Sequence, residues 1–464
     1  MTSHLIHRRL TSDYPVIAHG DGVFLYDRDG KRYLDGSGGA AVSCLGHRHP
    51  KVTAAVKDQL DRIAYAHTAF FTNAPAEELA EWLTARAPEG FGKAMFVSGG
   101  SEATEAALKS ARQVQVERGE PRRTRFIARQ QSYHGTTLAA LAVGGHVARR
   151  RIYEPVFDAG LLDGAMSRIA PCYAYRHRRP DESAEAYGAR AAAALEAEIQ
   201  RVGPDTVAAF VAETVVGATA GVIPPAPGYF RKIRRICDRY GVLLILDEVM
   251  CGMGRTGALY ACEQEQVVPD ILTAAKGLGA GYQPIGAMLA RDEHVDTITA
   301  GTGAPDHGHT YLAHTTACAA ALAVQKTIEE DNLLENVQAR GAQLMTLLQQ
   351  RLGQHPHVGD IRGRGLFVGI ELVEDRDTKR PFPPEHRLAA KLKSTAMRNG
   401  LVCYPAGGTA DGINGDHVLL APAFIIGESE VEMLVELLER SLGEALDAVQ
   451  ACGSGDAERR SAAG

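Results

Sequence analysis

Short apolar runs that each end in one polar residue are the feature that most constrains the fold of this chain. Residues 242–246 are all apolar and are followed by Asp247, and the mainly apolar residues 271–275 are followed by Lys276. Runs of this kind are typical of strands buried on both faces of a parallel sheet, and such sheets bind ligands beyond the carboxyl ends of their strands. The sequence therefore predicts one acid and one amine facing the same crevice.

The lysine at the end of the second run indicates a specific chemistry. A lysine that projects into a partly desolvated pocket loses part of its preference for the ammonium form, so it can attack a carbonyl carbon. Lys276 is therefore a candidate for Schiff-base formation with pyridoxal phosphate, with Asp247 beside it. An Asp and a Lys at two strand ends are more often a surface ion pair or a helix cap, so this interpretation needs support from the rest of the chain.

A phosphate-binding turn is the first supporting feature. A short apolar run before residue 98 leads into two glycines and Ser101, and apolar residues at helical spacing follow. Glycines let the backbone approach an anion closely, and a helix N-terminus offers free N–H groups with a favourable dipole. We expect a phosphate on the amides of Gly100, Ser101 and Glu102, although the same pattern also fits an ordinary strand-to-helix connection.

Two further strand ends carry polar or aromatic residues. Tyr133 follows the strand-like residues 125–128 and could lie flat on a heteroaromatic ring, because aromatic faces favour offset stacking. His134 beside it is weaker support, since it also fits a hydrogen-bonded loop histidine. Glu213 closes the apolar residues 207–212 and adds a carboxylate to the same predicted sheet edge.

The order and spacing of many short blocks resemble the class III, fold-type I pyridoxal-phosphate aminotransferases, which include ornithine, 4-aminobutyrate and omega-amino acid transaminases. The resemblance covers roughly residues 14–450, and its blocks are residues 19–22, 33–35, 46–50, 98–103, 133–135, 212–214, 246–249, 254–257, 275–277, 286–287 and 308–311. It implies an α/β fold: a large domain with a mostly parallel seven-stranded sheet covered by helices, and a smaller α+β domain built from both termini.

The resemblance also implies a domain organisation. Residues 1–60 would pack with the small domain, residues 61–330 would form the large cofactor-binding domain, and residues 331–450 would form the small domain. The small and polar residues 451–464 are expected to be a disordered tail.

The roles implied by the resemblance fall on individual residues. Lys276 would hold the cofactor as a Schiff base and then move the proton, and Asp247 would pair with the pyridine nitrogen. Val249 would press on the ring face opposite Tyr133. The remaining cofactor-binding positions are Gly100, Ser101, Glu102, His134 and Glu213, the last near the cofactor's hydroxyl side.

A homodimer with active sites at its interface is also implied. Thr310 resembles the threonine that reaches the phosphate of the neighbouring subunit.

The substrate is suggested by a missing residue. Many family members bind a substrate carboxylate through an arginine in the C-terminal part, but residues 400–424 contain no arginine. We therefore expect an amine or omega-amino compound as donor and a small oxo acid such as pyruvate as acceptor, or the reverse amination of a biosynthetic aldehyde or ketone. A racemase or epimerase and a dialkylglycine-type decarboxylase, with the same cofactor, remain alternatives.

Two other sequence patterns could indicate different functions. Residues 252–257 match Gly-x-Gly-x-x-Gly, which would suggest a dinucleotide-dependent oxidoreductase, but the surrounding strand–helix–strand context is absent. His307, His309 and His314 could suggest a metal site, but no carboxylate or thiol joins them at ligand spacing, so no metal is expected.

Composition excludes several classes of partner. The formal net charge of −6 gives no basic footprint, so a nucleic-acid partner is not expected. The basic residues 149–151 and 176–179 are interpreted as solvated loop faces. Eight cysteines without paired spacing indicate reduced thiols and a cytoplasmic enzyme. No stretch of 18 apolar residues occurs, so no membrane association is expected.

Overall fold

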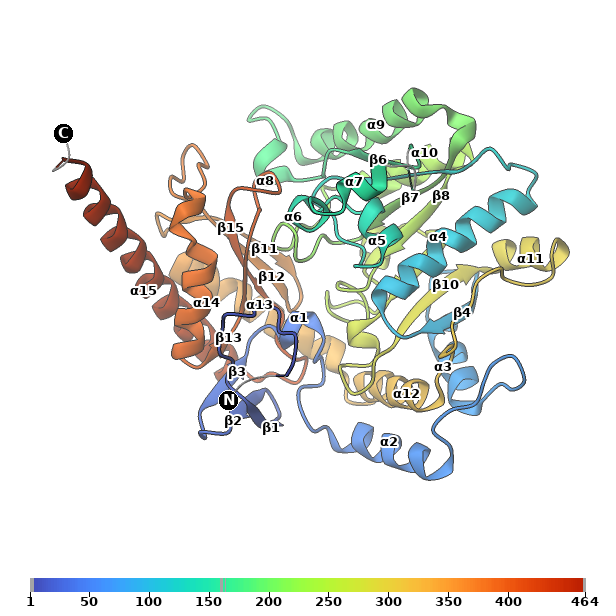
Figure 1. The fold of residues 1–464 in the computed structure, drawn as a ribbon, viewed down its shortest axis with the longest axis horizontal. Helices are drawn as coiled ribbons and strands as arrows, with labels where there is room; N and C mark the ends of the chain where they lie inside the picture. The colour runs from blue at the N-terminus through green and yellow to red at the C-terminus, as the bar shows by residue number, and fades with distance from the viewer. Residues whose placement is uncertain (1–3, 159–161, 163, 462–464) are drawn as a thin grey trace.

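A computed structural model describes residues 4–158, 162 and 164–461, with side chains described as far as Ala451. The chain forms a large body around one central sheet and a smaller body to which both ends of the chain contribute (Figure 1). Within the described residues, no helix is both long and apolar enough to cross a membrane.

The central sheet has seven strands in the order β4-β10-β9-β8-β7-β5-β6. Only β10 runs antiparallel to its neighbours, and the pairs from β9 to β6 are all parallel. The predicted fold class, with a mostly parallel seven-stranded sheet, is confirmed. The strands are β4 (Phe91–Val97), β5 (Arg125–Arg129), β6 (Met166–Ile169), β7 (Val207–Glu213), β8 (Leu243–Asp247), β9 (Ile271–Ala274) and β10 (Gly286–Arg291).

The apolar runs form buried strands because both faces of the sheet are covered. In β8, Leu244 and Leu246 join one hydrophobic cluster, whereas Leu243 and Ile245 join another on the opposite face, as the alternation of side chains along a strand requires. The first face is covered by α3 (Ala74–Thr84), α9 (Ala184–Val202), α10 (Tyr229–Tyr240) and α12 (Thr315–Glu330), and the second by α4 (Gly100–Glu117) and α11 (Asp292–Ala300).

The small body contains two four-stranded sheets. The first has the order β1-β2-β3-β13, and its β3 pairs in parallel with β13, so the two ends of the chain share one sheet. The second has the order β11-β12-β15-β14. The strands are β1 (Ile17–Asp21), β2 (Phe24–Asp27), β3 (Arg32–Asp35), β11 (Val358–Arg364), β12 (Phe367–Leu372), β13 (Leu401–Val402), β14 (Tyr404–Gly407) and β15 (Asp416–Leu420).

Helices of the small body pack on these sheets through one continuous apolar cluster. They are α13 (Leu333–Leu352), α14 (Leu388–Arg398) and α15 (Glu428–Ser461). Shorter or connecting helices are α1 (Gly38–Ala41), α2 (Pro50–Arg62), α5 (Leu138–Val143), α6 (Val147–Arg150), α7 (Glu154–Val156) and α8 (Ala174–His177).

The domain boundaries expected at residues 60 and 330 stay predictions. The first falls inside α2, which packs against α12, and the second coincides with the end of α12.

The tail, residues 451–464, which the sequence predicts to be disordered, lies only partly within the described part of the chain. The backbone continues α15 through Ser461. The side chains beyond Ala451 and all of residues 462–464 lie outside the described part of the chain.

The cysteines agree with the reduced thiols expected from the sequence. The seven whose side chains are described are all buried and unpaired: Cys44, Cys172, Cys237, Cys251, Cys262, Cys318 and Cys403.

Candidate active site

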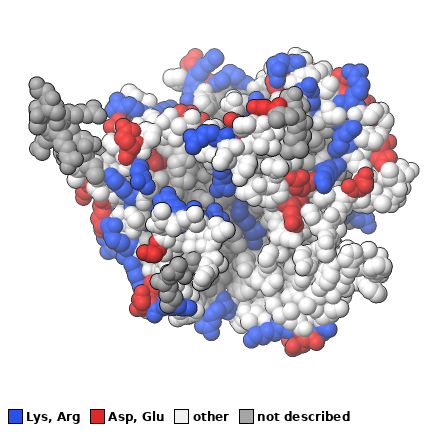
Figure 2. All heavy atoms as spheres, in the orientation of Figure 1, with Lys and Arg blue, Asp and Glu red and all other residues white. Residues whose placement is uncertain are grey.

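A cavity of about 520 Å³ lies at the carboxyl ends of the central strands, with residues of both bodies in its wall. Figure 2 shows a hollow across the middle of the molecule, with Lys and Arg side chains inside it. Eight of the predicted cofactor-binding residues line this cavity: Gly100, Ser101, Tyr133, His134, Glu213, Asp247, Val249 and Lys276. Residues up to 176 positions apart in the sequence, from Gly100 to Lys276, thus meet at one sheet edge.

Asp247 is held from two sides. It is the last residue of β8, and its Oδ1 accepts the backbone N–H of Val249 at 2.9 Å. Its Oδ2 lies 2.7 Å from Nδ1 of His134, and both side chains are buried. His134 is therefore the hydrogen-bonded histidine that the sequence allowed, and its partner is the predicted catalytic acid.

Lys276 lies where the strand β9 has just ended. Its φ of 45° is in the left-handed region, which is uncommon for a residue other than glycine and is often found at functional sites. Burial lowers the pKa of Lys276 from its ordinary value of 10.5, while the charges of Asp247 and Glu213 act in the opposite direction. The lysine therefore reaches its neutral, nucleophilic form at a lower pH than an exposed lysine does.

The predicted phosphate-binding turn has backbone N–H groups and close packing of the kind that an anion site needs. Helix α4 begins at Gly100, so the first N–H groups of this helix have no partner within the helix. A Cβ atom on Gly100 would lie 2.8 Å from Cγ1 of Val249, so a larger residue would close the cradle. Ser101 Oγ accepts the N–H of Thr136 at 3.0 Å, which fixes the hydroxyl at the turn.

Two predicted cofactor-binding residues do not line the cavity of the described chain. Glu102 folds its side chain back, and its Oε2 accepts the N–H of Ser98 at 2.7 Å. Its carboxylate caps the turn, so only its backbone amide is left for an anion. Thr310 is exposed, and its carbonyl accepts the hydroxyl of Tyr65 at 2.6 Å.

Glu213 ends β7 within the same wall. Its Oε1 accepts the N–H of Gly217 at 3.1 Å, and its Oε2 accepts the N–H of Tyr133 at 3.4 Å. Burial raises the pKa of Glu213, and the charge of Asp247 adds to this effect.

Two arginines in the cavity wall were missed at the level of sequence. Arg149 was grouped with the solvated basic residues 149–151, but α6 turns it toward Tyr133, with its guanidinium carbon 4.5 Å from the ring centroid. Arg8 reaches the same cavity from the N-terminal segment. The sequence of three consecutive arginines does not indicate which of them faces inward, so Arg149 could be identified only from the fold.

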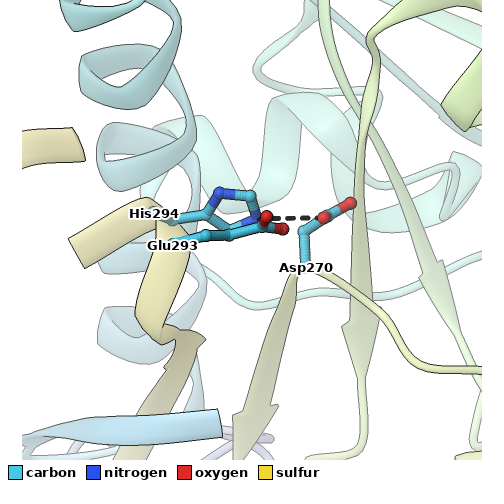
Figure 3. A group of neighbouring side chains, drawn as sticks. All are labelled: Asp270, Glu293 and His294. Carbon is cyan, nitrogen blue, oxygen red and sulfur yellow. Dashed lines mark hydrogen bonds and ion pairs between the residues drawn. The ribbon is translucent and has the colours of Figure 1, made fainter. Parts of the chain in front are cut away.

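One cluster has the residue types of a metal site. Asp270, Glu293 and His294 lie together at the amino end of β9 and the start of α11 (Figure 3). Arg118 donates to Nδ1 of His294 at 2.9 Å, which leaves the proton of Nε2 for Asp270 Oδ1, also at 2.9 Å. Both ring nitrogens of His294 are therefore occupied, and neither offers a lone pair to a metal.

Asp270 in this cluster is also neutralised by a cation. Its Oδ2 accepts Arg234 Nη1 and the N–H of Leu244, both at 2.6 Å. Although burial opposes it, the hydrogen bond from His294 and the charge of Arg234 lower the pKa of Asp270 to about 2. The cluster is thus an ion-pair network that ties α10 and α11 to the sheet.

The glycine pattern at residues 252–257 does not open a helix. Residues 250–260 form turns after β8, with Gly254 and Gly257 at positive φ. The cradle that a dinucleotide pyrophosphate would need is absent from this described segment.

Comparisons with known proteins identify the relatives of this chain. A family model described as aminotransferase class-III matches residues 8–442. An uncharacterised aminotransferase of Schizosaccharomyces pombe is 46% identical over 428 residues, which cover 92% of each chain.

Solved structures of transaminases have a similar fold. An (S)-enantioselective omega-transaminase from Thermomicrobium roseum has a TM-score of 0.88 and 34% identity, and the match covers 96% of this chain and 97% of that one. An amine transaminase from an uncultivated Pseudomonas species, solved in its pyridoxal-phosphate-bound form, has a TM-score of 0.87 and 36% identity, with 96% and 99% coverage.

Proposed function

Because the chain belongs to the class III aminotransferases and is a pyridoxal-phosphate-dependent transaminase, we propose that Lys276 and Asp247 form its reactive centre. The observation that carries this proposal is the placement of both residues at adjacent strand ends in one cavity. Pyridoxal phosphate supplies an aldehyde that can take up an amino group, and a ring that withdraws electrons from the carbon that loses its proton.

Two features of the cavity support binding of the cofactor. The N-terminus of α4, with the amides of Gly100, Ser101 and Glu102, would hold the phosphate. Tyr133 and Val249 would lie against the two faces of the ring. The closeness of Gly100 to Val249 supports this arrangement, because the turn admits no side chain between the cradle and the ring position.

Asp247 would keep a proton on the ring nitrogen of the cofactor. A carboxylate favours the protonated form of a neighbouring nitrogen, and a protonated ring withdraws electrons more strongly. His134 and the N–H of Val249 fix the two oxygens of Asp247, so the carboxylate keeps one orientation. His134 would therefore act on the cofactor through Asp247.

Lys276 would hold the cofactor by its aldehyde carbon and, when released, would carry the proton to and from the substrate carbon. Burial lowers its pKa, so at a given pH more of its released amine is neutral and able to accept a proton than in an exposed lysine. Glu213, with its raised pKa, would stand near the hydroxyl side of the cofactor, where its hydrogen bonds to Gly217 and Tyr133 hold it in place.

A homodimer would complete the site. Thr310 is exposed on the surface beside the exposed Tyr311, and Phe70 and Phe71 are also exposed. An exposed group of aromatic residues supports an interface between two copies of the chain. Thr310 of one subunit would then reach the phosphate in the neighbouring subunit's site.

The substrate class and the location of the protein are also proposals. We assign an amine or omega-amino compound as donor and a small oxo acid such as pyruvate as acceptor, supported by relatives named omega-transaminase and amine transaminase. A cytoplasmic location is supported by the seven buried, unpaired cysteines.

A donor panel tests the proposed function. The purified holoenzyme is incubated with single amines and amino acids without an oxo acid, and conversion of the cofactor to its amine form is followed by absorbance. Amines should convert the cofactor, and pyruvate should reverse the conversion. If no amine converts it while an amino acid loses carbon dioxide or its configuration, the assigned substrates and outcome are wrong.

A further inference from the structure

Arg149 is distinguished from its neighbours by what it does not contact. Arg150 donates to the carbonyls of Leu141 and Gly144 and lies 3.7 Å from the carboxylate of Glu154. Among the described residues, no acceptor and no carboxylate lies within bonding distance of the Arg149 guanidinium, which is half-buried in the wall of the active-site cavity. A partly desolvated guanidinium without a partner is costly unless an anion joins it.

The ring of Tyr133 holds this guanidinium in a fixed place. The guanidinium carbon lies 4.5 Å from the ring centroid, a cation–π contact that also orients the planar fork of N–H groups. A guanidinium fork recognises carboxylates through two parallel hydrogen bonds. The guanidinium is therefore already oriented to bind an oxoanion.

Apart from Arg8 and the reactive Lys276, the described charged or titratable residues of the cavity wall are unsuited to bind a carboxylate. The acids Glu213 and Asp247 are engaged with backbone N–H groups and His134. Burial and the charge of Arg149 lower the pKa of His146 to about 4, so this neighbour is neutral. The segment at residues 400–424 contributes Tyr404, Ala406 and Gly407 to the wall, but no cation.

We propose that Arg149 binds a carboxylate carried at the far end of the amino donor, so that the enzyme prefers amino acids with a distant carboxylate over plain alkylamines. This inference rests on the proposed function, since it takes Tyr133 to lie against the cofactor ring. The guanidinium contacts the ring of Tyr133, and among the described residues no ion pair joins it to Asp247, so a carboxylate bound there belongs to the far end of a donor whose amine is at the reactive centre.

Arg8 is the other arginine in the cavity wall. It is exposed and comes from the N-terminal segment, whereas Arg149 is half-buried on a helix and braced by Tyr133. A binding group works best when its side chain is held before the ligand arrives, which favours Arg149.

The test compares matched donors with the purified holoenzyme. The donors are unbranched amino acids with the amine and the carboxylate at opposite ends, four to six carbons long, and n-alkylamines of the same lengths. Single-turnover conversion of the cofactor is measured for the wild type, Arg149→Gln, Arg149→Lys, Arg8→Gln and the exposed control Arg151→Gln.

The expected result is selective. The wild type should prefer the carboxylated donors. Arg149→Gln should lower the ratio of the maximal single-turnover rate to the half-saturating donor concentration by about tenfold or more for them, mainly by raising that concentration, because a charge-assisted pair is lost. The alkylamines should change less than about threefold, and Arg149→Lys should recover part of the preference, since lysine keeps the charge but not the fork. Arg151→Gln should behave as the wild type.

Several results would overturn the assignment. A wild type without preference for the carboxylated donors, an equal loss for both donor series in Arg149→Gln, or a loss of preference in Arg8→Gln alone would each do so. Loss of bound cofactor from Arg149→Gln would show that this arginine holds the cofactor and not the substrate. Failure of the proposed function looks different, because the wild-type cofactor would then respond to no donor of either series.

Discussion

Nδ1 of His134 lies 2.7 Å from Oδ2 of Asp247, and neither side chain is more than 6% exposed. These residues are 113 positions apart in the sequence and come from the loop after β5 and the end of β8. The contact fixes the carboxylate that we propose to serve the ring nitrogen of the cofactor. His134 is thus a positioning residue whose effect passes through Asp247.

Replacing His134 should weaken catalysis without removing the cofactor. His134→Leu removes the donor, and a hydrogen bond to a charged group is worth about 1.5–3 kcal/mol, so kcat/KM should fall by roughly 10- to 100-fold. His134→Gln keeps a donor and should recover part of the loss. The absorbance of the bound cofactor should also change with pH differently in His134→Leu, whereas a purely structural role would leave that profile as in the wild type.

The pH dependence of the half-reaction at saturating donor should report the amine of Lys276 after the donor has released it from the cofactor. Its pKa is lowered from 10.5 by burial, so the rate should rise with pH through a limb that lies below the ordinary lysine range. Glu213→Gln removes a negative charge that favours the ammonium form, so the limb should move to lower pH. A limb that moves to higher pH, or does not move, would contradict the electrostatic coupling of these two groups.

The glycine at the start of α4 should be intolerant of a side chain. In Gly100→Ala, the new Cβ would lie 2.8 Å from Cγ1 of Val249, so binding of pyridoxal phosphate should weaken by about tenfold or more as the cradle distorts. The double variant with Val249→Ala should regain part of the affinity, because it removes the clashing atoms. Gly443→Ala, whose Cβ would meet no atom within 4 Å, is the control and should bind the cofactor normally.

A buried ion cluster should dominate stability at the junction of the two bodies. Glu371 is fully buried in β12 and accepts Arg176 Nε and Arg362 Nη1, both at 2.7 Å. Glu371→Gln removes the buried carboxylate that Arg176 and Arg362 share, leaves Arg362 only the carboxylate of Asp360, and should lower the free energy of unfolding by about 3–5 kcal/mol, measured by urea denaturation.

An exposed ion pair is the matched comparison for this change. Asp205 pairs with Arg122 at 2.6 Å, with both side chains more than half exposed, and Asp205→Asn should cost less than about 1 kcal/mol. Equal losses in the two variants would contradict the structural role of the buried cluster.

Metal ions should have no effect on the cluster of Asp270, Glu293 and His294. Both nitrogens of His294 are committed to Arg118 and Asp270, so added zinc should not raise the melting temperature, and a chelator should not lower activity. Stabilisation by zinc that disappears in His294→Gln would show that the hydrogen bonds yield to a metal.

The sequence could predict the strand ends but not what faces them. The apolar runs that precede Asp247 and Lys276 were readable because strands covered on both faces need continuous apolar residues. The contact between His134 and Asp247 was not, because it depends on a loop conformation that local patterns do not encode. Arg149 was hidden for a similar reason, since one inward arginine in a basic triplet is set by the direction of α6 alone.

Glu102 shows what the motif describes and what it leaves open. The motif places its backbone amide at the phosphate, which stays a prediction, and says nothing of its side chain, which caps the turn through the N–H of Ser98. Spacing along the chain predicted where the backbone lies, while the side chain followed the nearest unpaired donor.

The most direct test of the proposed role of Lys276 is to map where the cofactor is attached to the chain. The holoenzyme is reduced with borohydride, digested and mapped by mass spectrometry. One pyridoxyl adduct is expected, on Lys276, and none in Lys276→Ala. An adduct on another lysine, or a Lys276→Ala enzyme that keeps full transaminase activity, would contradict this role.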